Sequence, residues 1–73
     1  MLLSDLQTKD VINLTDGKKI GLITDIEIDR GGKITNFIVH KRKFLFFSGG
    51  RSLVEWKYID KIGKDVILVN VKG

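Results

Sequence analysis

Glycine-containing turn sequences divide this chain into a series of segments. Such turns are expected at Asp16-Gly17, Gly31-Gly32, Gly49-Gly50 and Gly63. Asp-Gly is a strong hairpin signal, because both residues tolerate positive φ. The segments between the turns are rich in isoleucine and valine, none keeps a helical period, and there is no proline. This pattern predicts an all-β fold of five or six short antiparallel strands rolled into a small barrel.

The expected strands cover residues 10–14, 19–29, 34–39, 52–56 and 66–71. Ser4 and Gln7 have the spacing of a capping box, which predicts at most one short helical turn near the N-terminus. Residues 58–62 are expected to form a tight turn that carries Ile59 and Ile62 into the core. Within 34–39, Phe37 to Val39 are consecutive and apolar, so one face of that strand is expected to line the core and the other a subunit interface.

The strand expected at 19–29 breaks its own alternation. Ile20, Leu22, Ile26 and Ile28 share one phase, whereas Ile23 falls out of it. Gly21 stands just before Ile23, and a glycine inside a strand pattern indicates a bulge or a tight bend. A bulge there lets a long strand curl, as a small barrel requires.

A length of 73 residues allows one domain, spanning 1–73. A domain of this size buries only about 60% of the surface that its unfolded chain exposes. Disulfides and metals often stabilise small scaffolds. This chain has no cysteine and a single histidine, His40, so we expect neither a disulfide nor a metal site, and no cofactor. Dense packing or self-association remains, which favours a homodimer.

Charge and hydropathy bear on location and partners. No apolar run approaches the ~20 residues that span a bilayer, and residues 1–5 lack the features of a secretory signal, so we expect a cytoplasmic protein. Residues 1–30 carry four basic and six acidic groups, net −2, and residues 31–73 carry nine basic and three acidic groups, net +6. Such asymmetry can mark a surface for nucleic acid or membrane, although interspersed surface charge explains it more simply.

The residue types that carry catalysis do not form a recognisable set. His40 ends an expected strand with no nucleophile or carboxylate nearby in sequence, so we interpret it as a surface or interface residue. Asp25, Glu27 and Asp29 share one strand face, which we interpret as solvated charge offset by neighbouring lysines rather than as a cation site. The glycines lack the spacing of a phosphate-binding loop. We therefore expect neither an enzyme nor a small-molecule substrate.

The segment 41–47 is the most unusual part of the chain. It joins three basic residues to a cluster of aromatic residues, and we expect the interface to comprise Lys41, Arg42, Lys43, Phe44, Phe46, Phe47 and Arg51. Side chains of a strand alternate between its faces, so not all the phenylalanines can point inward. An exposed apolar patch usually needs a partner to cover it. The phenylalanines are thus expected to anchor a protein interface, and the basic residues to provide charge selectivity.

Two other interpretations of segment 41–47 remain open. Basic and aromatic residues together can bind RNA, and they can adsorb to an anionic membrane surface.

Trp56 is interpreted as a core anchor whose indole N–H is satisfied.

Two segments of the chain resemble PRC-barrel domains. The first is Asp16-Gly-Lys-Lys-Ile-Gly-Leu-Ile-Thr-Asp-Ile-Glu-Ile-Asp29 with Gly32-Lys33-Ile34, which resembles the opening hairpin of these domains. The second runs from Phe46-Phe47 through Leu53-Val-Glu-Trp56 to Ile59-Asp-Lys-Ile-Gly-Lys-Asp-Val-Ile-Leu-Val69. It resembles the YlmC/YmxH group of short, stand-alone bacterial PRC-barrel proteins. Glu55 departs from the group, which commonly has proline before the tryptophan.

The resemblance implies a small six-stranded PRC-type antiparallel β-barrel and a link to sporulation or cell division, and it implies no catalytic residues. It favours a cytoplasmic protein-interaction module that binds itself and a further protein. The presence of the same domain in the ribosome maturation factor RimM keeps an RNA- or ribosome-associated module as the alternative.

Overall fold

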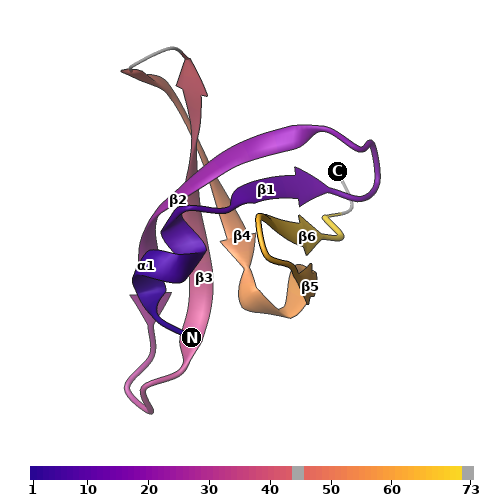
Figure 1. The fold of residues 1–73 in the computed structure, drawn as a ribbon. Coiled ribbons are helices and arrows are strands. Elements are labelled where there is room, and N and C mark those ends of the chain that lie inside the picture. The colour runs from indigo at the N-terminus through magenta and orange to yellow at the C-terminus, as the bar shows by residue number, and fades with distance from the viewer. Residues whose placement is uncertain (44–45, 72–73) are drawn as a thin grey trace.

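A computed structural model of the chain describes residues 1–43 and 46–71, of which 42, 43 and 46–49 are described by their backbone alone. It consists of six strands, one short helix and one 3-10 turn, so the predicted all-β class is confirmed (Figure 1). The elements are α1 Leu3–Gln7, β1 Asp10–Asn13, β2 Lys19–Ile28, β3 Ile34–Lys43, β4 Phe46–Glu55, η1 Trp56–Tyr58, β5 Ile59–Ile62 and β6 Val66–Val69.

The strands form one mixed sheet in the order β4-β3-β2-β1-β6-β5. The antiparallel pairs β1–β2 and β2–β3 follow the hairpins predicted at Asp16-Gly17 and Gly31-Gly32, but β1 and β6 pair in parallel, with Val11 opposite Ile67 and Asn13 opposite Val69. The expectation of a wholly antiparallel, closed barrel is therefore wrong in detail. Turn signals report only which neighbours along the chain pair, and β1 and β6 are far apart in sequence. In the described part of the chain, β4 and β5 stand at the two ends of a curled sheet (Figure 1).

The predicted turns at the first two glycine sites are confirmed. Gly17 adopts φ 69° and Gly32 adopts φ 84°, a region that residues with a Cβ avoid. The Asp29 N–H donates to the Lys33 carbonyl at 2.9 Å and so closes the second hairpin. Gly49 and Gly50 were predicted to form a turn, but they lie inside β4. Glycine followed by glycine permits a turn without requiring one, and here the strand continues through the pair.

Strand β2 is irregular at three places, and two of these lie on either side of Gly21. Its register with β1 shifts between Val11 and Ile12, and its register with β3 shifts between Ile23 and Asp25. The predicted bend near Gly21 is thus confirmed. The shifts also exchange the faces of β2, so that Ile23 is buried whereas Ile28 is 59% exposed. The residues that shared one phase in the sequence therefore do not share one environment.

The core consists of buried residues from α1, β1, β2, β3, β4 and β6. The elements η1 and β5 contribute no fully buried residue. The buried members of the core are Leu6, Val11, Ile23, Phe37, Val39, Val54, Ile67 and Val69. Strand β5 replaces the tight turn predicted at 58–62, but Ile59 and Ile62 pack against the core as expected. The helical turn at the N-terminus is also confirmed, although its cap is the Asp5 carboxylate, which accepts from the Leu2 N–H at 2.8 Å.

Candidate functional site

The outer face of β2, β3 and β4 carries a surface groove. In the middle row of this face, Ile38 lies opposite Asp25 of β2 on one side and opposite Leu53 of β4 on the other. Phe37 and Val39 are buried on the inner face. Since side chains of a strand alternate between its faces, Ile38 must point outward. The outward side of this strand is the one for which the sequence predicted an interface.

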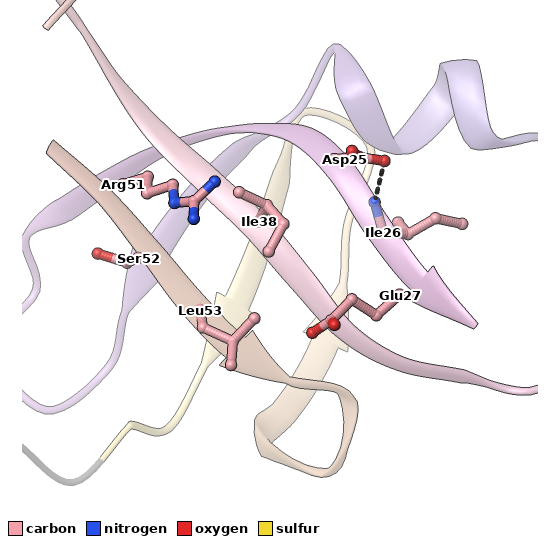
Figure 2. A pocket seen from close by; sticks show the side chains of 7 residues that line it. All are labelled: Asp25, Ile26, Glu27, Ile38, Arg51, Ser52 and Leu53. Atoms are coloured by element: carbon pink, nitrogen blue, oxygen red, sulfur yellow. Dashed lines mark hydrogen bonds between the residues drawn. The ribbon is translucent and has the colours of Figure 1, made fainter. Parts of the chain in front are cut away.

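An open groove of about 460 Å³ runs along this face (Figure 2). It is lined by Asp25, Ile26, Glu27, Ile38, Arg51, Ser52 and Leu53. We refer to these residues as the outer groove. Leu53 is 58% exposed, which makes it a prominent apolar group beside the half-buried Ile38. An apolar centre with a polar surround is the usual composition of a protein-binding surface.

Acidic groups occupy one side of the outer groove. Asp25 and Glu27 are both exposed, and the Asp25 Oδ1 accepts from the Ile26 N–H at 2.8 Å (Figure 2). The sequence predicted that Asp29 shares their face, but it lies in the hairpin turn, where its Oδ1 accepts from the Lys33 N–H at 3.0 Å. Turn closure explains this difference, because β2 ends one residue earlier, at Ile28.

The described residues form two ion pairs that bear on the expected offset of these carboxylates by lysines. Among the described residues, the ion pairs join Lys19 to Asp10 and Lys57 to Glu55. Neither pair involves the carboxylates of the outer groove.

Arg51 supplies the basic side of the outer groove and lies opposite His40 in the β3–β4 register. His40 is half-buried, and its Nδ1 forms a short hydrogen bond with the Thr24 hydroxyl. This contact gives the only histidine of the chain a structural role on the outer face. Lys41 is exposed and lines a separate hollow with Lys19, Ile20 and Gly21. Arg51 and Lys41, both members of the predicted interface, line different depressions.

The rest of the predicted interface cannot be placed in the same way. Phe44 lies outside the described residues, and the side chains of Arg42, Lys43, Phe46 and Phe47 do as well. Their backbones continue the β3–β4 ladder, with Arg42 opposite Phe47 and Lys43 opposite Phe46.

Trp56 was interpreted as a core anchor, and the structure corrects this. Its side chain is 40% exposed and packs on the buried ring of Phe37, with 5.2 Å between ring centroids and 48° between ring planes. The residue begins the 3-10 turn η1, directly after β4. Leaving the strand there lets the indole cover one side of the core instead of entering it.

Sequence reasoning missed Leu53 and the position of the two acidic groups relative to it. Leu53 precedes the buried Val54, so alternation alone would have placed it outside. The position of the acidic side could not be predicted, because the bulge after Ile23 determines which residues of β2 lie opposite Ile38.

The described residues contain no group of three or more histidine, cysteine, aspartate or glutamate side chains that could hold a metal ion. Among the same residues, no helix has the length and apolar character needed to cross a bilayer. The chemistry that this surface offers is recognition: apolar contact at its centre, carboxylates on one side and a guanidinium on the other.

Comparison with known proteins gives a consistent result. Residues 1–73 match the family described as the PRC-barrel domain. The probable sporulation protein YlmC of Bacillus subtilis (strain 168) is 44% identical, over 94% of this chain and 90% of its own length. An uncharacterized protein of Clostridium acetobutylicum is 40% identical, over 89% and 78% respectively. YmxH of Bacillus subtilis is 33% identical, over 97% and 89%. The similarity therefore extends along nearly the whole chain.

Proposed function

The chain belongs to the PRC-barrel family, and from that premise we propose that it is a non-catalytic protein-interaction module that acts in the cytoplasm in a process linked to sporulation. The link to sporulation derives from the name of its relative YlmC. The interaction itself is proposed from the outer groove.

One observation carries the proposal: exposed Leu53 lies beside Ile38 on a surface with carboxylates on β2 and a guanidinium on β4. Leu53 is 58% exposed, and isolated apolar residues on a surface need no explanation. Here, however, Ile38 continues the apolar area on the neighbouring strand, and the groove around both residues is concave. Concave apolar surfaces with polar rims are where partners anchor large side chains.

The charges indicate what kind of partner fits. Asp25 and Glu27 would attract a basic residue, and Ile38 and Leu53 would contact an apolar one. We therefore propose a partner segment that carries an apolar anchor followed by a lysine or arginine. The carboxylates would set orientation and speed association more than they would add affinity.

A photo-crosslinking amino acid tests this proposal directly. It is placed at Ile38 in one variant and at Leu14, which is 45% exposed in the turn after β1, in a matched control. In cells that enter sporulation, we expect adducts with another protein from position 38 and none from position 14. The additional change Glu27→Lys should reduce these adducts, because it reverses the charge of the acidic side.

Every other outcome of this experiment counts against the proposal. Adducts with RNA would favour the ribosome-associated alternative, and their yield should fall steeply with salt as phosphate contacts are lost. Adducts with lipid would favour a membrane surface. Equal yields from both positions, or no adducts at all, would mean that the outer groove is not a protein-docking site.

A further inference from the structure

Strand β4 ends the sheet and exposes a long edge. In the described part of the chain it pairs with β3 on one side and with no strand on the other. It spans ten residues, Phe46–Glu55, and the sequence places no proline in it. An unprotected edge of this kind offers a row of N–H and C=O groups to another strand.

The direction of the carbonyl groups in β3 shows which residues of β4 face this edge. The Ile38 carbonyl accepts from the Thr24 hydroxyl of β2 at 3.4 Å. The His40 carbonyl also points at β2, since its carbon would lie 2.6 Å from a Cβ placed on Gly21. Both carbonyls thus point away from β4. In an antiparallel pair such residues form the positions that do not exchange hydrogen bonds.

It follows that the residues of β4 opposite Ile38 and His40 direct their backbone N–H and C=O groups away from β3, toward the free edge of the sheet. These residues are Leu53 and Arg51, and Glu55 continues the same alternation opposite Asn36. The free hydrogen-bonding groups of the edge therefore belong to Arg51, Leu53 and Glu55. The side chains of the same three residues lie on the outer face.

The order of these side chains is self-complementary. A basic residue precedes Leu53 by two positions, and an acidic residue follows it by two. When two such strands run antiparallel with Leu53 opposite Leu53, each Arg51 lies opposite Glu55 of the second copy. Opposite charges in facing positions stabilise a strand pair, and like charges destabilise it.

We propose that two copies of this chain pair along β4, antiparallel and centred on Leu53, so that their sheets form one continuous sheet across a two-fold axis. The pairs Leu53–Leu53 and Arg51–Glu55 would each exchange two backbone hydrogen bonds, which satisfies the groups of the free edge. The closed two-fold arrangement uses the same surface on both copies and leaves no β4 edge for further growth.

Other registers are weaker. A shift of one copy by two residues breaks both Arg51–Glu55 pairs. A shift by four places Arg51 opposite Arg51, or Glu55 opposite Glu55. Within the monomer, Glu55 has only a loose ion pair with Lys57, at 3.8 Å between Oε1 and Nζ, and both side chains are well exposed. That contact would yield easily to an arginine of the second copy.

Pairing in this register would also extend the outer groove. Ile38 and Leu53 of one copy would continue into Leu53 and Ile38 of the other, forming one apolar stripe across the two-fold axis. The inference goes beyond the proposed function, since a monomer could bind a partner in the groove equally well.

Cysteine crosslinking tests the register. The chain has no cysteine, so each single-cysteine variant reports on one position. Facing residues in a hydrogen-bonded antiparallel pair have Cβ atoms at the long end of about 4.5–5.5 Å, farther apart than the roughly 3.5–4.5 Å of a disulfide. A short bifunctional thiol reagent is therefore used in place of direct oxidation. With this reagent and micromolar protein, Leu53→Cys should form a linked dimer. Ile28→Cys is the matched control, because Ile28 is 59% exposed and Leu53 is 58% exposed.

Charge exchange tests the same register without a covalent bond. In sedimentation equilibrium, Arg51→Glu or Glu55→Arg alone should weaken the dimer by about tenfold or more, because each change creates two like-charge pairs across the axis. The double variant, which restores opposite charges, should return to within about threefold of the original affinity. Circular dichroism confirms that each variant is folded.

The result that overturns the inference is also defined. The proposed dimer is refuted if the wild-type protein stays monomeric at the highest concentration tested. Crosslinking of Ile28→Cys as fast as Leu53→Cys would also refute it. So would a dimer whose affinity neither single charge reversal changes, because self-association would then use another surface. Adducts from position 38 to another protein would survive any of these results, so failure of the dimer and failure of the proposed docking function are distinguishable.

Discussion

Gly21 leaves no room for a Cβ beside the backbone of β3, and we predict that Gly21→Ala destabilises the fold more than any other glycine-to-alanine change at a described position. Gly21 is buried in β2 opposite Val11 of β1. An added Cβ would meet the carbonyl group of His40, with its carbon at 2.6 Å, and the Lys41 nitrogen at 3.0 Å. These are backbone atoms of β3, so no side chain can rotate away to relieve the clash. The φ of Gly21, 149°, is a further obstacle for a residue with a Cβ.

The magnitude combines two costs. Overpacking in a well-packed interior costs about 1–3 kcal/mol, and a residue held in a sparsely populated backbone region costs about 1–3 kcal/mol. We therefore expect a loss of about 2–6 kcal/mol in the free energy of unfolding. Natural domains have about 0.05–0.15 kcal/mol of stability per residue, or roughly 4–11 kcal/mol for a chain of this length. The substitution should remove a large part of the total.

Two other glycines provide matched controls. Gly50 lies in β4 with nothing within 4 Å of an added Cβ, so Gly50→Ala should change stability by less than about 0.5 kcal/mol. Gly17 has equally open surroundings but adopts φ 69°, so Gly17→Ala isolates the backbone cost, about 1–2 kcal/mol. The difference between Gly21→Ala and Gly17→Ala then measures the clash with β3.

Urea denaturation is the appropriate assay. The single tryptophan, Trp56, packs on the core residue Phe37 and should report loss of the core by fluorescence. All variants must be compared at one protein concentration, because self-association would add to the apparent stability. The reasoning is refuted if Gly21→Ala is no less stable than Gly17→Ala, or if its stability lies within about 0.5 kcal/mol of the wild type.

Three further substitutions test the core and the surface by the same assay. Phe37→Ala should cost about 3–5 kcal/mol, because the ring is 1% exposed and the cavity left behind cannot fill; a cost below about 1 kcal/mol would contradict this. Thr24→Val keeps the branched shape but removes the hydroxyl bonded to His40 and to a strand carbonyl, and it should cost about 0.5–1.5 kcal/mol. An increase in stability would show that those hydrogen bonds contribute nothing. Lys19→Ala breaks the ion pair with Asp10, 2.9 Å long and well exposed, and should cost less than about 1 kcal/mol. A loss above 2 kcal/mol would mean that this pair does more than screened surface charge can.

The turns at Gly17 and Gly32 were predictable because local chemistry determines them: a positive φ needs glycine, whatever the rest of the fold does. The buried side of β3 was predictable for a similar reason, since alternation places Phe37 and Val39 together. The parallel pairing of β1 with β6 was not, because no local signal reports on a contact between segments so far apart.

The candidate site likewise combines a residue that was predictable from the sequence with others that depend on the tertiary fold. Arg51 was singled out from the sequence and does line the outer groove. Its neighbours there, Leu53 and Asp25, depend on the register of three strands and on a bulge in β2. Neither register nor bulge position follows from the composition of a strand, so the geometry had to be observed. The emphasis on the phenylalanines of segment 41–47 stays a prediction.

The parallel pairing of β1 with β6 also has a consequence for how the chain acquires its structure. Strands β2, β3 and β4 are joined by short connections and can pair as soon as they are synthesised. Strand β1, at the other end of the chain, obtains its second neighbour only once residues 66–69 exist. Ile67 and Val69 are completely buried, so the core lacks two of its members until then. Pairing of two distant segments requires the loss of loop entropy before any stabilising contact has formed, so it slows folding. The pairing of β1 with β6 therefore converts a hairpin meander into a domain, and a truncation before residue 66 should leave β1 paired with β2 alone, with its other edge open to the wrong partner.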